Sequence, residues 1–374
     1  MVVNQLQRMM SMTGNIKKPS MYLDQNALDE LRKRGRDDHF SALKDKYSFV
    51  YSNSTLREIH KAGVNADDSE KTAEFIILLT KLEATYFQLP DISSNSDARP
   101  YECTDTPCNV YLRFLDEDLR YDEFTQPMEK IGLAVHNGIR DYEQFGDTQI
   151  SSMLALKDFL SDKLATLELE GANCTDENAK SHLEAFIDLY RQRMQSLESQ
   201  LHDFKKDVRL VNEKFREANQ DQSMSKAFRD AYCINVDNLK KIEGFNALNR
   251  IFSYLDEVKP ENLLQIKEIY KDIFDENKRI FNRIFIIYDF LNLIGYYPDE
   301  SLNKENKLLR SNLDRSHATL GCFCDILVTH DKRFIKKIKV IYEHFNIATK
   351  IYDIKVLDDQ TSFKVLYDLV EEII

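Results

Sequence analysis

Four acidic residues lie where their carboxylates could act together. They are Asp24, Glu58, Asp314 and Asp331. The first follows the apolar run Met21–Leu23, and the last follows the apolar run Ile326–Val328. Strand carboxyl ends and helix N-termini share one edge of a parallel sheet, so we expect all four at that edge. Their oxygens would bind Mg²⁺ or Mn²⁺, which activates a bound water for phosphodiester hydrolysis.

The elements that must position these acids follow from apolar spacing and turn residues. Strands are predicted at residues 20–24, 47–51, 86–89, 325–329 and 350–354. Helices are predicted at residues 25–34, 55–62, 68–85, 331–346 and 360–374, and Asp314 is expected in the first turn of a further helix. Gly35 and Gly63 are the expected stops of the first two helices. Strands that alternate with helices predict an α/β fold with a parallel sheet.

The middle of the chain has a different pattern. Residues 91–110 read as a loop, and residues 111–298 read as helix after helix. Apolar residues three and four apart predict helices at 151–170 and 177–219, and one helix or a helix pair in each of 224–255 and 261–295. Long helices joined by short loops favour an antiparallel bundle. We therefore expect an α/β domain split in sequence: its first half at 18–95, an all-α insertion at 96–304, and its second half at 305–374.

The order of the acids resembles that of the PIN-domain nucleases. That family has an acid followed by x-Asn after its first strand, a glutamate on its second helix, an acid on a late helix, and a Thr-x-Asp. The matching residues are Asp24 with Asn26, Glu58, Asp314, and Thr329 with Asp331. The resemblance covers residues 18–90 and 305–357, and the helical insertion departs from the compact family pattern. It implies a PIN-like fold, four acids that bind Mg²⁺ or Mn²⁺, supporting roles for Asn26 and Thr329, and RNA as the favoured substrate over DNA.

Basic residues cluster inside the same two segments. Those expected to contact substrate phosphates are Arg32, Arg34, Lys332, Arg333 and Lys336. A solvated helix face is the alternative interpretation of such clusters. The formal net charge of −12 argues against a protein that coats nucleic acid nonspecifically.

Each acid also has a simpler explanation. Asp24 could cap the helix that follows it, and Asp314 and Asp331 could complement helix dipoles, with Thr329 as the cap before Asp331. Glu58 could form a capping box with Thr55. Asp325 begins its strand and is expected at the opposite edge. Independent capping does not predict the strand-Asp-x-Asn and strand-Thr-x-Asp contexts, which is why we favour the metal site. His317 is interpreted as a helix-packing residue.

The sequence lacks the motifs of an NTPase, a Rossmann dehydrogenase and an α/β-hydrolase. It contains neither of the two glycine-rich phosphate-binding loops, and it contains no nucleophile elbow. No apolar run reaches the roughly 18 residues of a membrane span, and the N-terminal residues do not read as a signal peptide. The six cysteines read as free thiols, which favours the cytoplasm.

We therefore expect a metal-dependent endonuclease, with RNA the favoured substrate. One alternative is a non-catalytic interaction or scaffold protein that uses a degenerate PIN fold and a helical arm. Another is a DNA-directed or defence-type nuclease gated by a partner. The helical insertion is a candidate surface for a second copy of the chain or for a regulatory protein.

Overall fold

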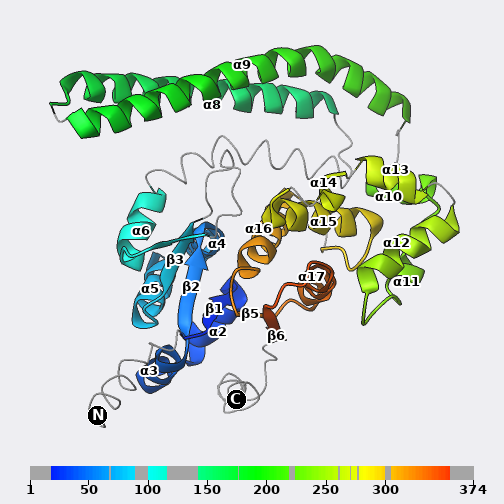
Figure 1. Cartoon of the computed structure of the whole chain (residues 1–374), viewed down its shortest axis with the longest axis horizontal. Helices are drawn as coiled ribbons and strands as arrows, with labels where there is room; N and C mark the ends of the chain where they lie inside the picture. Colours follow the sequence, from blue (N-terminus) through cyan, green and yellow to red (C-terminus); the bar gives the residue numbers. More distant parts are fainter. Residues whose placement is uncertain are drawn as a thin grey trace, which may run out of the picture. The chain divides into compact units, whose positions relative to one another are not determined.

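The computed structural model describes residues 18–66, 69–88, 100–115, 142–175, 177–218, 224–259, 262–269, 271–275, 278–299 and 305–353. Six strands form one sheet in the order β4-β3-β2-β1-β5-β6 (Figure 1). They are β1 (Ser20–Leu23), β2 (Ser48–Ser52), β3 (Thr85–Gln88), β4 (Tyr101–Cys103), β5 (Ile326–Thr329) and β6 (Lys350–Asp353). All neighbours pair in parallel except β3 and β4, which are antiparallel. The predicted α/β class is confirmed.

The central strand joins the two ends of the sequence. β1 pairs with β2 on one side and with β5 on the other, with Leu23 opposite Val328. The side chains of Met21, Tyr22 and Leu23 are buried, and so are all four residues of β5. Parallel strands covered on both faces read as continuous apolar runs, which is why both strands could be predicted.

Helices connect the parallel strands: α2 (Gln25–Arg34) and α3 (Asp37–Lys46) between β1 and β2, α4 (Asn53–Ala66) and α5 (Ser69–Lys81) between β2 and β3, and α17 (Lys332–His344) between β5 and β6. The first part of the chain also contains α6 (Pro107–Arg113), which follows β4, and α14 (Lys271–Phe274) lies later in the sequence. α2 begins directly after Asp24 and ends at Gly35, as predicted. A β-carbon on Gly35 would lie 2.2 Å from the ring of Phe40, so the close approach of α3 requires a glycine there.

Two predictions about these elements were wrong, and one helix was missed. α4 continues through Gly63, because its inward residues Leu56 and Ile59 are fully buried and outweigh a cost of about 1 kcal/mol for a helical glycine. The predicted loop at 91–110 contains β4 and the start of α6, and β4 is too short to show a period of its own. Helix α3 was not predicted. The predicted helix at 360–374 lies outside the described residues.

The remaining helices occupy the middle of the chain. They are α8 (Tyr142–Asn173), α9 (Glu177–Ala218), α10 (Met224–Ala231), α11 (Val236–Leu239), α12 (Ala247–Val258), α13 (Asn262–Ile269), α15 (Ile280–Ile294) and α16 (Glu305–Gly321). Ion pairs from Lys157 to Glu198 and from Arg191 to Glu168 show that α8 and α9 are antiparallel. One apolar seam joins these two helices, and its buried residues are Met153, Leu156, Leu160, Leu197 and Leu201. The segments 224–255 and 261–295, each predicted as one helix or a helix pair, are divided further, into α10, α11 and α12 and into α13, α14 and α15.

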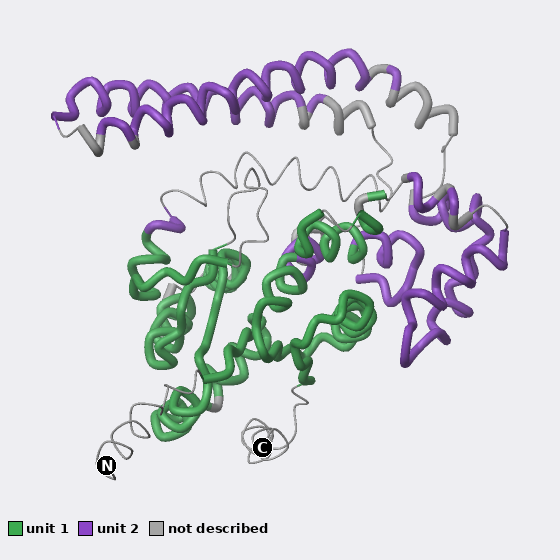
Figure 2. Tube along the Cα trace, in the orientation of Figure 1, with its two compact units in different colours: residues 1–112, 270–288, 316–374 green, residues 113–269, 289–315 purple. Residues whose placement is uncertain are grey.

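Two compact units divide the chain (Figure 2). The first contains residues 1–112, 270–288 and 316–374, and the second contains residues 113–269 and 289–315. α15 and α16 each contribute residues to both units. The first unit holds the whole sheet. Among the described residues, no helix combines the length and hydropathy that a membrane span requires.

Candidate active site

The strand order reverses at β1, because β2 lies on one side of it and β5 on the other. In open parallel sheets, ligands bind beyond the carboxyl ends of the strands at such a switch point. Asp24 directly follows β1, and Thr329 is the last residue of β5. The first and last acidic motifs of the sequence therefore meet where this fold most often places a binding crevice.

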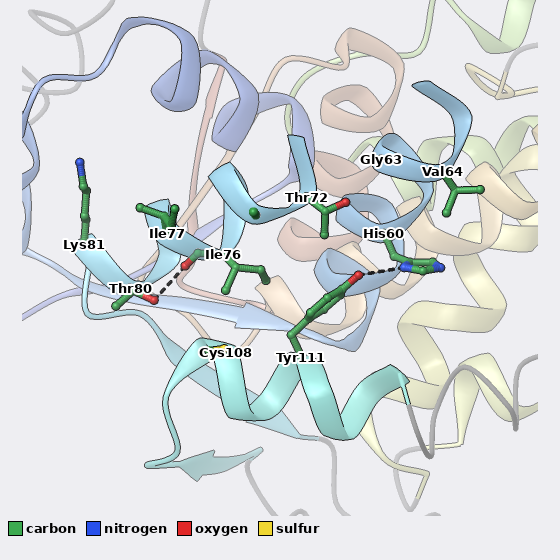
Figure 3. Close-up of a pocket in the computed structure, with 11 residues that line it drawn as sticks. His60, Gly63, Val64, Thr72, Ile76, Ile77, Thr80, Lys81, Cys108 and Tyr111 are labelled. Atoms are coloured by element: carbon green, nitrogen blue, oxygen red, sulfur yellow. Dashed lines mark hydrogen bonds between the residues drawn. The ribbon is translucent and has the colours of Figure 1, made fainter. Parts of the chain in front are cut away.

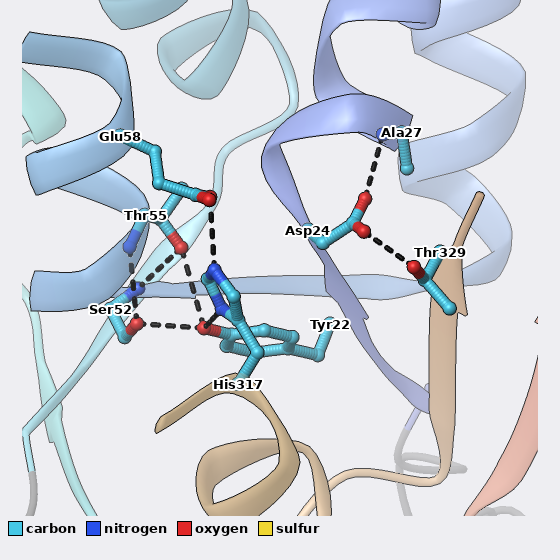
Figure 4. Close-up of polar contacts among 8 residues, drawn as sticks. All are labelled: Tyr22, Asp24, Ala27, Ser52, Thr55, Glu58, His317 and Thr329. Carbon is cyan, nitrogen blue, oxygen red and sulfur yellow. Dashed lines mark hydrogen bonds and ion pairs between the residues drawn. The ribbon is translucent and has the colours of Figure 1, made fainter. Parts of the chain in front are cut away.

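Asp24 is held by both of its oxygens (Figure 4). Its side chain is 6% exposed. Oδ1 accepts a hydrogen bond from the Ala27 amide at 2.8 Å, and Oδ2 accepts one from Thr329 Oγ1 at 2.5 Å. Burial raises the pKa of Asp24 above its ordinary value, although the hydrogen bonds from Thr329 and Ala27 oppose the rise. The charge of Glu58 raises this pKa further, so Asp24 and Glu58 repel each other.

Glu58 does not form the capping box that its sequence context allows. α4 begins at Asn53, and the Thr55 amide donates to Ser52 Oγ at 3.4 Å. Glu58 instead accepts a hydrogen bond from His317 Nε2 at 2.9 Å. The Glu58 side chain is 15% exposed, so its carboxylate lies near the surface without being fully solvated.

His317 is more than the helix-packing residue that we expected. It is 1% exposed, and its Nδ1 lies 2.7 Å from the Tyr22 hydroxyl. That hydroxyl lies 2.7 Å from Ser52 Oγ and 3.4 Å from Thr55 Oγ1. The only signal in the sequence for the contacts of His317 was its polar side chain on the buried side of a helix. Figure 4 shows the resulting chain of hydrogen bonds, which begins at Glu58 and passes through His317 and Tyr22 to Ser52.

The electrostatics of this chain of hydrogen bonds indicate which groups carry protons. Burial alone lowers the pKa of His317, but the charge and hydrogen bond of Glu58 outweigh it, and the pKa is raised. Burial raises the pKa of Tyr22 well above its ordinary value, so the hydroxyl stays protonated. A Glu58 carboxylate can only accept, which identifies His317 Nε2 as the donor.

Asp331 caps α17. Its Oδ1 accepts hydrogen bonds from the amides of Arg333 at 2.8 Å and Phe334 at 3.0 Å. Its own amide donates to Thr329 Oγ1 at 3.1 Å, which links Asp331 to Asp24 through a single hydroxyl. Asp331 therefore belongs to the same edge of the sheet as Asp24.

Asp314 does not begin a helix. It is half-buried within α16, which starts at Glu305, and it groups with the second unit. The first-turn prediction was wrong because residues 305–310 include Glu, Lys, Leu and Arg, which are strong helix formers. Asn26 is half-buried in the first turn of α2, where the group that contacts Asp24 is the Ala27 amide.

The carboxyl edge continues beyond β5. His330 Nδ1 lies 3.6 Å from Asp353 Oδ1, which joins the ends of β5 and β6. Asp325 lies at the opposite edge, as expected, where its Oδ2 accepts hydrogen bonds from the amide and the hydroxyl of Ser20. Polar side chains therefore collect at both edges, and Asp24 and Glu58 lie at the carboxyl edge.

The predicted phosphate contacts differ in their surroundings. Arg32 is engaged with Asp29 and Glu74. Lys332 and Arg333 are exposed in the first turn of α17, next to Asp331, and Lys336 is half-buried one turn later. The side chain of Arg34 lies outside those that the structure describes.

The carboxylates at this edge are ligands of the type that Mg²⁺ prefers. Within the described part of the chain, no group of three or more His, Cys, Asp or Glu side chains could hold a metal ion. Mg²⁺, however, commonly binds one or two protein carboxylates and completes its shell with waters and substrate phosphates. Asp24 and Glu58 supply two carboxylates at the carboxyl edge of the sheet.

A cavity of about 810 Å³ lies elsewhere in the first unit, between α4, α5 and α6 (Figure 3). Its walls include the exposed apolar side chains of Val64 and Ile77. The polar groups His60 and Tyr111 on its wall are hydrogen bonded to each other at 2.9 Å. None of its described lining residues is acidic, so this groove offers apolar contact and not the acid chemistry of the sheet edge.

No family model, curated protein or solved structure matches this chain. Its function is therefore inferred from its residues and their geometry.

Proposed function

We propose that the protein is a metal-dependent phosphodiesterase that cleaves nucleic acid at the carboxyl edge of its sheet. The observation that carries this proposal is the position of Asp24 at the switch point of the sheet, with Glu58 on α4 at the same carboxyl edge. A buried acid whose pKa is perturbed by burial and by a neighbouring charge is typical of a functional site. The resemblance to PIN-domain nucleases favours RNA over DNA as the substrate.

Each residue has a defined part in this proposal. Asp24 and Glu58 would hold Mg²⁺ or Mn²⁺, with Asp331 close by at the same edge. The ion, when bound, supplies an activated water and stabilises the leaving oxygen. Thr329 and the Ala27 amide fix the orientation of the Asp24 carboxylate. The exposed cations Lys332 and Arg333 would contact phosphates of the substrate.

The proposal is tested with labelled single-stranded RNA and DNA, incubated in Mn²⁺, Mg²⁺ or EDTA. The variant Asp24→Asn keeps the size of the side chain and its acceptor for the Ala27 amide, and it should fold but lose nearly all cleavage. The matched control is Asp325→Asn, which changes an acid at the opposite edge and should cleave like the wild-type protein. Cleavage that survives EDTA or the Asp24→Asn substitution would refute the proposal.

A second candidate is a non-catalytic interaction protein. It is favoured by the capping contacts of Asp331 and by the absence of a three-residue metal cluster in the described residues. The antiparallel pair α8 and α9 would then supply the partner surface. Calorimetry with Mn²⁺ separates the candidates: a wild-type protein that neither binds the ion nor cleaves RNA or DNA favours the interaction protein.

A further inference from the structure

A chain of hydrogen bonds ends at Glu58. The carboxylate is on α4, the histidine that donates to it is on α16, and the tyrosine that contacts this histidine is on β1. Ser52, at the end of β2 and directly before α4, contacts the same tyrosine. The end of β2 and the start of α4 are therefore connected to β1 and to the distant helix α16 through His317 and Tyr22.

The same connections tie the two carboxylates together. Tyr22 lies in β1, two residues before Asp24, which directly follows the strand. Glu58 is consequently positioned relative to the strand that leads into Asp24, although Glu58 and Asp24 are on different elements. A glutamate side chain has several rotamers to lose when it becomes fixed, and a hydrogen-bond donor that is already in place removes that freedom in advance.

The donor to Glu58 does not depend on the charge of the histidine. In neutral His317, Nε2 carries the proton, because the Glu58 carboxylate has none to give, and Nδ1 accepts from Tyr22. In charged His317, both nitrogens donate, and the Tyr22 hydroxyl donates to Ser52. Both states are satisfied by the observed distances of 2.9 Å and 2.7 Å.

We propose that His317 is a positioning residue that holds the Glu58 carboxylate ready for a divalent cation. This inference rests on the proposed function, since it assigns a partner to one of its two acids. Groups that hydrogen bond to metal ligands orient those ligands, and their loss commonly weakens metal binding about 10- to 100-fold. His317 is buried and hydrogen bonds to Glu58, so we expect its effect on a bound ion to be exerted through Glu58.

The test measures Mn²⁺ and Mg²⁺ binding to the full chain by calorimetry. His317→Leu removes the donor and should weaken Mn²⁺ binding about 10- to 100-fold. His317→Gln can present an amide N–H toward Glu58 and should recover most of that loss. The control Thr349→Val removes a buried hydroxyl that donates to the Cys324 carbonyl at 2.6 Å, so it should lower the melting temperature and leave the affinity for Mn²⁺ unchanged.

A double-mutant cycle separates positioning from general damage to the fold. In Glu58→Ala, the further substitution His317→Leu should cause no additional loss of Mn²⁺ affinity, because its only route of action is gone. Losses that add in the double variant, or wild-type affinity in His317→Leu, would overturn the inference. If His317→Leu does not fold, Tyr22→Phe tests the same chain by removing one hydroxyl. Unchanged Mn²⁺ affinity in that variant would also overturn it.

The failure of the inference differs from the failure of the proposed function. Wild-type protein that binds neither ion and cleaves neither RNA nor DNA refutes the function, and the inference with it. Wild-type protein that binds Mn²⁺, with His317→Leu binding equally well, refutes the inference alone.

Discussion

Removal of one hydroxyl should destabilise the carboxyl edge of the sheet. Thr329 is fully buried, donates to Asp24 Oδ2 at 2.5 Å, and accepts from the Asp331 amide at 3.1 Å. In Thr329→Val, the lost bond to a charged acceptor costs about 1.5 to 3 kcal/mol, and the lost amide bond costs about 1 kcal/mol more. The new methyl group returns about 0.8 kcal/mol. We expect a net destabilisation of about 2 to 3 kcal/mol.

This destabilisation should depend on pH. Burial raises the pKa of Asp24 above its ordinary value of 3.8, and the Thr329 hydrogen bond opposes that rise. Because the bond favours ionised Asp24, its contribution is present above the folded-state pKa and is lost as the pH falls through it. Thr329→Val should therefore be more destabilising at about pH 8 than at about pH 4.

Hydrogen exchange of the β1 and β5 amides is the suitable assay. The chain has no tryptophan and two compact units, so one fluorescence transition would not report on the sheet alone. The control Thr80→Val removes the hydroxyl of an exposed residue, which donates to the Ile76 carbonyl at 2.9 Å. It should change the free energy of opening measured by exchange by less than about 0.5 kcal/mol. Equal exchange in Thr329→Val and Thr80→Val would refute the reasoning. A loss of stability in Thr329→Val that does not depend on pH would also refute it.

Three further predictions concern other parts of the structure. Replacing Lys332 and Arg333 by alanine should weaken nucleic-acid binding and reduce its salt slope by about 1 per residue, while stabilising α17 slightly, since cations oppose the dipole at a helix N-terminus. Anisotropy titrations across a salt series check this, and an unchanged slope contradicts it. Gly295→Ala should cost about 1 to 3 kcal/mol in denaturant unfolding, because Gly295 has φ +87° and a β-carbon would lie 2.8 Å from Val236; a cost under about 0.5 kcal/mol would show that this turn relaxes. Without metal, Asp24→Asn should raise the melting temperature at neutral pH and lose this advantage toward about pH 4, because the raised pKa means that ionised Asp24 is a cost; a lower melting temperature at neutral pH would contradict that sign.

Local sequence patterns were sufficient to predict the elements next to Asp24 and Asp331. β1 and β5 are apolar runs that end at Leu23 and Thr329, and α2 ends at Gly35, so each could be predicted from a few neighbouring residues. The pairing of β1 with β5 agrees with the predicted α/β class. No comparable local signal marks β4, whose three residues depend on a partner strand.

The contacts of the acids could not be predicted in the same way. His317 contacts Glu58 across 259 positions and Tyr22 across 295, and no local period encodes such pairs. Glu58 has the spacing of a capping box, yet α4 starts at Asn53 and leaves its carboxylate free for His317. The prediction for Asp314 failed for a different reason. Strong helix formers before Asp314 lengthen α16, so the helix begins at Glu305 and not next to Asp314.

The pairing of β1 with β5 also determines when this protein can become functional during synthesis. Asp24 and Thr329 are 305 positions apart, and at roughly 5 to 20 residues per second a ribosome needs about 15 to 60 seconds to cover that interval. Until then, one edge of β1 has no partner strand and can pair with a wrong strand. Chaperones protect nascent chains against such mispairing. A nascent or truncated chain that lacks β5 cannot make the hydrogen bond from Thr329 to Asp24, so under the proposed function it should be inert until β5 has been synthesised.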